Sequence, residues 1–437
     1  MNFIDLFSGC GGLSLGLLEA GYKGIFAIEK NSEAFDTFKH NLLLSGKRHF
    51  KYGYNWDESF LPIQPWNIHD LLDSHTPYLE SLGKKQSIDL IVGGPPCQGF
   101  SMAGKRNVLD PRNQLAYDYL KVVNLVKPKI LLMENVKGIN IPFTGCGEVS
   151  VADKLRHSMT EMGYIPVSIM ENSQDWGVPQ KRIRYLLLGL RKDLLKNNMG
   201  HFSKIQEELI LELNEFRKNF VKDNQLVVGI SVGAAISDLK SIDINNKGRQ
   251  LVIAEDAPGF RFKRIQERYV LDKADESIYL KKMRKNIVSD DYVPTGLRLA
   301  NHSERIKNRF IKILKDIQDP KFKEFYGIGT AKNLPKKYIE LELEFNKNSI
   351  VVLDREKPSV TITTLPDDII HYDEPRILTV RENARIQSFP DWFDFMGSYT
   401  TGGDRRKISC PKYTQVGNAV PPLMAEGIGL FLLKKFN

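Results

Sequence analysis

The sequence holds little cysteine and no long apolar run, and each absence argues against a class of protein. Cysteine occurs only four times among 437 residues, at Cys10, Cys97, Cys146 and Cys410. Without paired CxxC spacing, these cysteines predict neither a zinc site nor a small disulfide framework, and they fit a reducing cytoplasm. No apolar run reaches the roughly 18 residues that a membrane span requires, so we expect no membrane partner.

Other missing patterns narrow the chemistry further. Residues 1–5 lack the basic start and the apolar core of a signal peptide. No GxxxxGK[ST] segment occurs, which argues against a P-loop ATPase. No histidine stands near Cys97 in the sequence, so a Cys–His protease arrangement gains little support. We expect no bound metal, and the sequence contains no internal repeat.

The composition that is present is that of a large, basic, folded protein. A length of 437 residues is comfortable for two domains. Hydrophobic residues make up 42%, enough for a core, and 62 Lys or Arg against 53 Asp or Glu give a net charge of +9. This excess fits a polyanionic partner such as nucleic acid, and it equally fits a generally basic solvated surface.

The stretch 93–101, Gly-Gly-Pro-Pro-Cys-Gln-Gly-Phe-Ser, carries the most distinctive candidate residue. It follows the apolar run 88–92, which predicts a buried parallel strand. Its glycines and prolines then force a sharp turn with Cys97 at the tip. Sheets of α/β proteins bind ligands past the carboxyl ends of their strands, so Cys97 is a candidate nucleophile. The alternative, a buried packing cysteine, leaves the turn around it unexplained.

The N-terminal segment predicts a nucleotide-type binding site. A short apolar strand over 3–7, interrupted only by Asp5, runs into a glycine-rich turn at 8–12 and then an amphipathic helix. Such a turn lets a ligand approach the backbone and the free N–H groups of the helix. A second strand, 24–28, ends at Glu29, which is placed to accept hydrogen bonds from ribose hydroxyls. A plain strand-to-helix turn is the alternative.

Further elements are expected between these two motifs. Asn31 predicts the cap of a helix that runs to about Leu44. The polar, Pro-containing stretch 45–65 is typical of a loop, and we expect a short third strand to end near 66–68.

The segment 98–112 predicts a lid over the cysteine turn, or alternatively an ordinary surface loop. Gly99 and Gly104 would serve as its hinges. The polar and basic side chains that could contact a nucleic acid are Gln98, Ser101, Lys105, Arg106 and Arg112.

An acid and two arginines follow on later strands. After a helix over about 113–126, the apolar run 129–133 predicts a strand that ends in Glu134, beside the strand that carries Cys97. Arg182 and Arg184 alternate at strand spacing, which predicts two guanidinium groups on one face. The alternatives are a structural role for Glu134 and a solvated strand face for the arginines.

The chain divides into three segments by composition. The strand–helix rhythm stops near Arg191, and 191–375 is basic, irregular and rich in Lys, Asn and Ile. From 376 the order returns, with a helix to about Phe389 and an apolar C-terminal helix opened by Gln415–Pro422. We therefore expect an α/β catalytic domain over 1–190, a second, basic domain over 191–375, and a C-terminal segment, 376–437, that completes the first.

These pieces together suggest covalent catalysis by a cysteine. A thiolate at Cys97 would attack an electron-poor carbon, and an acid at Glu134 would make that carbon electrophilic by protonating the substrate. An arginine could hold both the acid and a substrate carbonyl. The glycine-rich turn would hold a second substrate by its ribose.

At this point the sequence resembles the DNA (cytosine-5)-methyltransferase family of the bacterial restriction-modification type. Six family motifs occur in the usual order, at Asp5–Gly12, Gly93–Ser101, Glu134–Val136, Gln180–Arg184, Arg376–Glu382 and Gln415–Asn418. The resemblance implies a Rossmann-like methyltransferase sheet with helices on both faces. It also implies that 191–375 forms a smaller, irregular target-recognition domain that binds DNA.

The resemblance also implies a role for each matching residue. Cys97 would attack C6 of a flipped-out cytosine at an angle set by Pro96, and Glu134 would contact N3. Arg184 would bridge the acid and the base, with Arg182 close by. S-adenosyl-L-methionine, released as S-adenosyl-L-homocysteine, would lie against residues of several motifs, with Glu29 on its ribose. Its contacts would be Phe7, Gly9, Gly11, Gly12, Glu29, Asn67, Ile68, Pro95 and Asn418.

One position departs from the family pattern. Asn67 stands where the family usually has Asp for the adenine amine; an Asn carbonyl can accept the same hydrogen bond, and Asp70 is the other candidate. The resemblance further implies double-stranded DNA as partner, a monomer in the cytoplasm, and functional pairing with a restriction endonuclease that needs no physical contact. An RNA methyltransferase on the same scaffold and a catalytically inactive DNA-binding relative are the alternatives.

Overall fold

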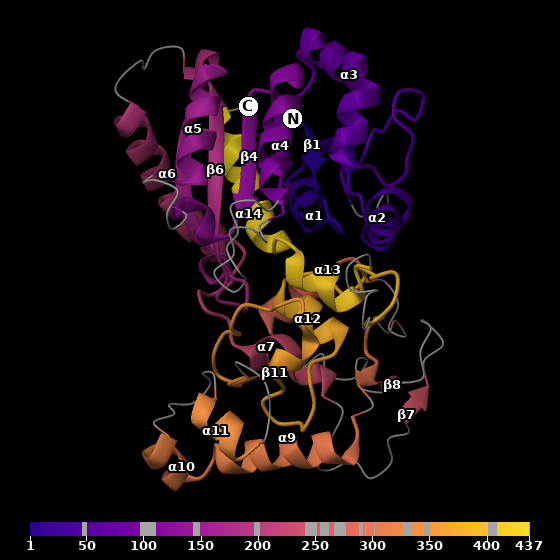
Figure 1. Ribbon diagram of the computed structural model, residues 1–437, viewed down its shortest axis with the longest axis vertical. Coiled ribbons are helices and arrows are strands. Elements are labelled where there is room, and N and C mark those ends of the chain that lie inside the picture. The colour runs from indigo at the N-terminus through magenta and orange to yellow at the C-terminus, as the bar shows by residue number, and fades with distance from the viewer. Residues whose placement is uncertain are drawn as a thin grey trace. The chain divides into compact units, whose positions relative to one another are not determined.

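The computed structural model describes most of the chain, in two compact units (Figure 1). The first unit comprises Met1–Trp176, Ile183–Asn224 and Val420–Asn437, and the second comprises Gly177–Arg182 and Gln225–Ala419. The described residues are 1–45, 50–96, 111–142, 149–195, 202–240, 251–253, 262–265, 277–287, 292, 294–300, 302–326, 334–343, 350–400 and 409–436.

A six-stranded sheet in the order β2-β1-β3-β4-β6-β5 forms the centre of the first unit. β1 to β4 run parallel, and β6 runs antiparallel to both β4 and β5. The strands are nearly continuous apolar runs, as expected for a sheet that is covered on both faces. Their bounds are β1 Asn2–Leu6, β2 Lys23–Ile28, β3 Leu90–Gly93, β4 Ile130–Asn135, β5 Tyr164–Asn172 and β6 Ile183–Arg191.

Helices cover both faces of this sheet, so the predicted α/β class is confirmed. Apolar side chains of α3, α4 and α5 share one core with those of β3, β4 and β6. On the opposite face α1 packs on α14, and α14 packs on α6. The helices are α1 Gly12–Glu19, α2 Ser32–Phe38, α3 Ile68–Lys85, α4 Leu115–Val126, α5 Val151–Glu161, α6 Phe202–Asp223 and α14 Pro422–Phe436.

Two local expectations near the second strand have different outcomes. Asn31 does cap α2, because its side-chain oxygen accepts a hydrogen bond from the Ala34 N–H; the helical path then continues as a π-helix over Lys39–Ser45. The third strand expected at 66–68 is wrong. Asn67 is instead the N-cap of α3, whose buried Ile68, Leu71, Leu79 and Leu82 follow helical spacing.

The second unit combines short helices with two small sheets. β7, β8 and β9 form an antiparallel sheet, and β10 pairs with β11 in parallel. Its strands are β7 Leu251–Ile253, β8 Phe262–Ile265, β9 Leu299–Ala300, β10 Val351–Val352 and β11 Ile369–Ile370. Its helices are α7 Val232–Ile236, α8 Ile278–Met283, α9 Glu304–Asp316, α10 Pro320–Tyr326, α11 Lys336–Leu341, α12 Val380–Ile386 and α13 Lys412–Asn418.

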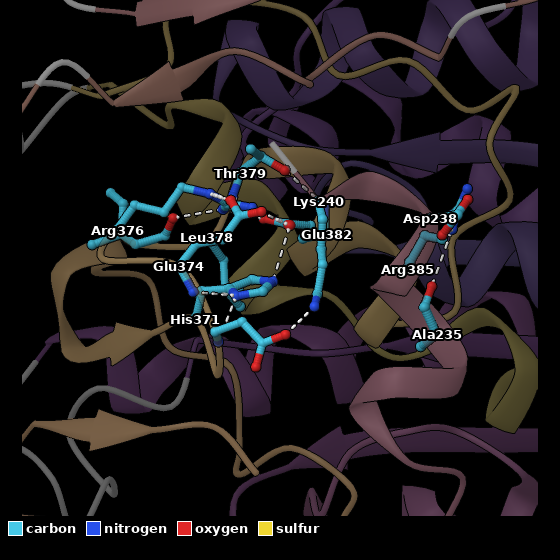
Figure 2. Close-up of polar contacts among 12 residues, drawn as sticks. Ala235, Asp238, Lys240, His371, Glu374, Arg376, Leu378, Thr379, Glu382 and Arg385 are labelled. Carbon is cyan, nitrogen blue, oxygen red and sulfur yellow. Dashed lines mark hydrogen bonds and ion pairs between the residues drawn. The ribbon is translucent and has the colours of Figure 1, made fainter. Parts of the chain in front are cut away.

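A buried charged cluster organises the segment before α12 (Figure 2). Arg376 forms a two-pronged ion pair with Glu382 and a third bond with Glu374, whose Oε2 lies 2.5 Å from the Arg376 Nε. Glu382 also closes the capping box of α12 with Thr379. Such a network is stable in the interior only because every charge meets an opposite one. The predicted motif Arg376–Glu382 is therefore a structural element of the second unit.

The compact units have other bounds than the predicted segments. α6 belongs to the first unit, so the long segment of the second unit begins after Asn224, and the short segment Gly177–Arg182 also belongs to the second unit. The chain returns to the first unit at Val420 instead of 376. Among the described helices, the stretch Lys412–Phe436 is long and apolar enough to cross a membrane, but 72% of its apolar window is buried inside the protein, as is typical of a core helix.

Candidate active site

The glycine-rich turn after β1 is held in a conformation that favours glycine. Phe7, Gly9 and Gly11 have φ angles of 64°, 56° and 96°. A Cβ on Gly11 would lie 2.7 Å from Leu42 Cδ1 and 2.9 Å from Phe38, whereas no described atom lies within 4 Å of a Cβ on Gly9. Gly11 therefore packs on the core, and Gly9 faces open space.

The same turn exposes the start of α1. Gly12 is the first residue of α1, and no described side chain caps this helix end. The backbone N–H groups of the first turn are therefore available to a polar ligand.

Glu29 joins the turn after β2 to the turn after β1. Its Oε2 accepts the Gly9 N–H at 3.1 Å, and its Oε1 accepts the Asn31 N–H at 2.8 Å. Burial raises the pKa of Glu29, while these two backbone bonds oppose that rise. The carboxylate keeps further lone pairs for other donors, such as hydroxyls.

A buried polar row beneath the turn was not predicted as part of the site. The Ser14 hydroxyl donates to Asp5 Oδ2 at 2.5 Å, and its oxygen lies 2.7 Å from the Tyr54 hydroxyl. Burial raises the pKa of Asp5 to about 7. The single acidic residue within an otherwise apolar strand was the signal in the sequence, although nothing there could identify Tyr54 as its neighbour.

The residues expected on the adenine are in different environments. The Asn67 side-chain oxygen accepts the His69 N–H at 3.3 Å, so this side chain is engaged as a helix cap. Ile68 is buried in the core, and Asp70 is exposed in the first turn of α3.

Only part of the cysteine turn is described. Cys97 and the lid residues Gln98, Ser101, Lys105 and Arg106 lie outside the described residues. Before them, Pro95 is buried and its carbonyl oxygen accepts the Asn135 side-chain N–H at 3.2 Å, while Pro96 is partly exposed. Arg112 lies in a short 3-10 helix, Pro111–Gln114, and is partly exposed.

Glu134 and Arg184 form an ion pair at the end of the sheet. The Arg184 Nε lies 2.8 Å from Glu134 Oε1, and both side chains are largely buried, at 12% and 13% exposure. Arg184 also donates from Nη1 to the carbonyl oxygen of Ile183 at 2.8 Å. A Cβ on Gly94 would lie 3.2 Å from Glu134 Oε2, so the cysteine turn approaches this acid closely. The predicted acid, one predicted arginine and the start of the predicted turn are thus brought together.

Arg182 does not share this environment, so the expectation of two guanidinium groups on one strand face is wrong. Arg182 lies before the first residue of β6 and is buried in the second unit. Its Nη1 donates to the Ile362 carbonyl at 3.2 Å, and its Nη2 donates to the Gly417 carbonyl at 2.9 Å. The strand spacing was misleading because the strand starts one residue later, at Ile183.

Asn418 is the exposed last residue of α13, in the second unit. Within the described ranges, no group of three or more His, Cys, Asp or Glu side chains could hold a metal ion.

Comparison with known proteins first defines the fold. The chain is similar to a crystal structure of a DNA modification methyltransferase encoded within an E. coli prophage, with a TM-score of 0.60, 22% identity and 99% of both chains covered. Together with the sheet order and the glycine-rich turn, this likeness assigns the chain to a methyltransferase fold.

The sequence comparisons then identify the family. A family model described as C-5 cytosine-specific DNA methylase matches residues 1–434, so the chain belongs to this family and the resemblance inferred from its motifs is confirmed. The chain is 31% identical to type II methyltransferase M.DdeI of Desulfomicrobium norvegicum, covering 98% of this chain and 87% of that protein. It is 28% identical to type II methyltransferase M.XorII of Xanthomonas oryzae pv. oryzae, covering 99% and 84%.

Proposed function

We propose that this protein transfers a methyl group from S-adenosyl-L-methionine to C5 of a cytosine within a specific double-stranded DNA sequence. The observation that carries the proposal is the largely buried Glu134–Arg184 pair beside the turn that leads to Cys97. A paired acid at a strand end next to a nucleophile is the arrangement that covalent activation of a pyrimidine ring needs.

The chemistry would start with the thiolate of Cys97. Its sulfur forms a bond to C6 of the cytosine, while Glu134 holds N3 and stabilises the electron density that moves into the ring. C5 becomes nucleophilic and takes the methyl group, which S-adenosyl-L-methionine supplies. A base then removes the C5 proton, the sulfur–C6 bond breaks, and Cys97 leaves as a thiolate.

Arg184 would act by orientation. Its Nε is bound to Glu134 and its Nη1 to a backbone carbonyl, so the guanidinium plane is fixed and can present another N–H to the base. Arg182 would act only indirectly, by tying the segment around Ile362 to the end of α13.

The methyl donor would bind at the turn after β1. Open space at Gly9, the uncapped start of α1 and the Glu29 carboxylate fit a ligand with a ribose and a charged amino-acid end. Phe7, Gly11, Gly12, Pro95 and Asn418 stay proposed contacts, as do Asn67 and Ile68; Asn67 is the weakest of these because its side chain already caps α3.

The target base would have to leave the DNA stack, since C6 and C5 are inaccessible within a duplex. The net charge of +9 supports binding to the phosphate backbone. The segment 98–112 would close over the base, and the second unit would read the sequence. The type II relatives support a role in protecting host DNA from a restriction endonuclease.

Transfer of a labelled methyl group to duplex DNA and to tRNA tests this function. We expect label in DNA and none in tRNA, and Cys97→Ser should abolish transfer while DNA binding survives. Label in tRNA alone would support an RNA methyltransferase, and label in neither would support an inactive DNA-binding protein. Continued turnover by Cys97→Ser would refute the nucleophile assignment.

A further inference from the structure

A second acidic residue stands directly opposite Arg184 in the sheet. Glu171 of β5 is the register partner of Arg184 in β6, and Glu134 of β4 is the partner of Leu186. Directly opposite residues of antiparallel strands point to the same face, and so do residues two apart along one strand. Glu134, Arg184 and Glu171 therefore share one face, with the arginine between two carboxylates.

Opposite side chains in such a ladder have their Cβ atoms about 5 Å apart, well within the reach of an arginine. Arg184 nevertheless pairs with Glu134, which lies on the diagonal. Something therefore keeps the Glu171 carboxylate from competing for the guanidinium.

Glu171 is held by two other groups. Its Oε2 accepts both the Trp176 indole N–H and an Arg217 Nη1–H, each at 2.7 Å. Arg217 comes from α6, where its Nη2 donates to Asn214 Oδ1 at 2.8 Å. A Cβ on Gly427 of α14 would lie 2.3 Å from the Trp176 ring, so the ring packs directly against the backbone of α14. The Glu171 carboxylate thus has two donors on the side of α6.

We propose that Arg217 and Trp176 are positioning residues for methyl transfer: they hold the Glu171 carboxylate away from Arg184, so that Arg184 pairs with Glu134 alone. This inference rests on the proposed role of Glu134. The face then carries alternating charges from Glu134 through Arg184 and Glu171 to Arg217, and each acid has its own arginine. None of the six family motifs contains Glu171 or Arg217.

Removing Arg217 would free a buried carboxylate beside Arg184. Burial raises the pKa of Glu171, Arg217 opposes that rise, and Asp175 adds to it. A cavity of about 340 Å³ is lined in part by Glu171, Asp175 and Arg217. Without Arg217, Glu171 would be neutral at low pH and harmless. At higher pH it would ionise and draw Arg184 from Glu134.

The test compares Arg217→Ala with the double variant Arg217→Ala/Glu171→Gln, with Lys218→Ala as control. Lys218 is the next residue of α6, exposed and of equal charge. The readout is the single-turnover rate of methyl transfer at about pH 6 and about pH 8.5, on protein checked for folding by thermal unfolding. A displaced catalytic group costs on the order of ten- to a hundredfold in rate.

We expect the single-turnover rate of Arg217→Ala to fall by about ten- to a hundredfold at the higher pH and by less at the lower pH. Its KM for DNA should be unchanged. The double variant should recover because an amide does not compete for Arg184, and the control should match the wild type. A full rate in Arg217→Ala, or a double variant as slow as the single one, would overturn the inference.

A crystal structure of Arg217→Ala at the higher pH gives a readout that does not depend on activity. It should show Arg184 on Glu171, and Arg184 still on Glu134 would contradict the inference. Absence of transfer by the wild-type protein would instead count against the proposed function alone.

Discussion

Replacing each of two glycines of one turn by alanine should affect different properties: Gly11→Ala should mainly lower stability, and Gly9→Ala should mainly weaken binding of the methyl donor. Gly11 has φ 96°, and a Cβ there would lie within 2.9 Å of two buried side chains, Phe38 and Leu42. Backbone strain of about 1–2 kcal/mol and overpacking of about 1–3 kcal/mol predict that Gly11→Ala loses about 2–5 kcal/mol of unfolding free energy. Gly9 has φ 56° and open space, so Gly9→Ala should lose only about 1 kcal/mol.

Gly9→Ala should weaken binding of the methyl donor more than Gly11→Ala does, because we place the donor in the open space at Gly9. Urea unfolding without donor measures the first quantity, and titration calorimetry with S-adenosyl-L-methionine measures the second. Gly9→Ala should bind the donor at least about tenfold more weakly, a change of about 1.4 kcal/mol. Gly21→Ala, with φ 91° and no described atom within 4 Å, is the control for backbone strain alone. Wild-type donor affinity in Gly9→Ala would refute the reasoning.

Three further variants test other parts of the structure. Burial lowers the pKa of His371 to about 3. As the pH falls below about 6.5, the imidazole therefore takes up a proton in the unfolded chain but not in the folded one, and the free energy of unfolding decreases. His371→Asn should remove about 2 kcal/mol of this decrease between about pH 6.5 and pH 5, as measured by urea titrations. The pKa of Asp5 is raised to about 7. As the pH rises from about 4 to 7, the carboxyl group therefore keeps its proton in the folded protein but loses it in the unfolded chain, and the free energy of unfolding decreases. Asp5→Asn should remove this decrease, which is on the order of 4 kcal/mol. Arg182→Met should cost about 3 kcal/mol of stability, because two buried carbonyls lose their donor, yet keep the single-turnover rate, whereas Arg184→Met should lose about a hundredfold in rate.

Residues at the ends of strands could be predicted from the sequence because strand direction alone fixes their place. Glu29 follows β2 and Glu134 lies near the end of β4, and both strands belong to the parallel part of the sheet, so the two acids lie at the carboxyl ends of its strands. The cap at Asn31 was equally local, since an Asn before a helix needs only its own backbone to bond.

Other residues could not be predicted because their partners are distant in the sequence. Asn67 has the chemistry of an adenine contact and of a helix cap, and only the course of α3 shows that its side chain caps a helix. The spacing of Arg182 is that of a strand residue, but β6 starts only after it. Its hydrogen bonds go to Ile362 and Gly417, which lie 180 and 235 positions further along the chain. The bond from Arg217 to Glu171 depends on α6, a helix that composition had grouped with the second domain.

Bisulfite sequencing of DNA from cells that express the wild-type protein or Cys97→Ser tests the central claim most directly. We expect protected cytosines at one position of one recurring sequence in wild-type cells, and none in cells with the variant. Equal protection in both would contradict the covalent role of Cys97. Absence of protected cytosines with the folded wild-type protein would contradict the proposal that this chain methylates DNA at cytosine C5.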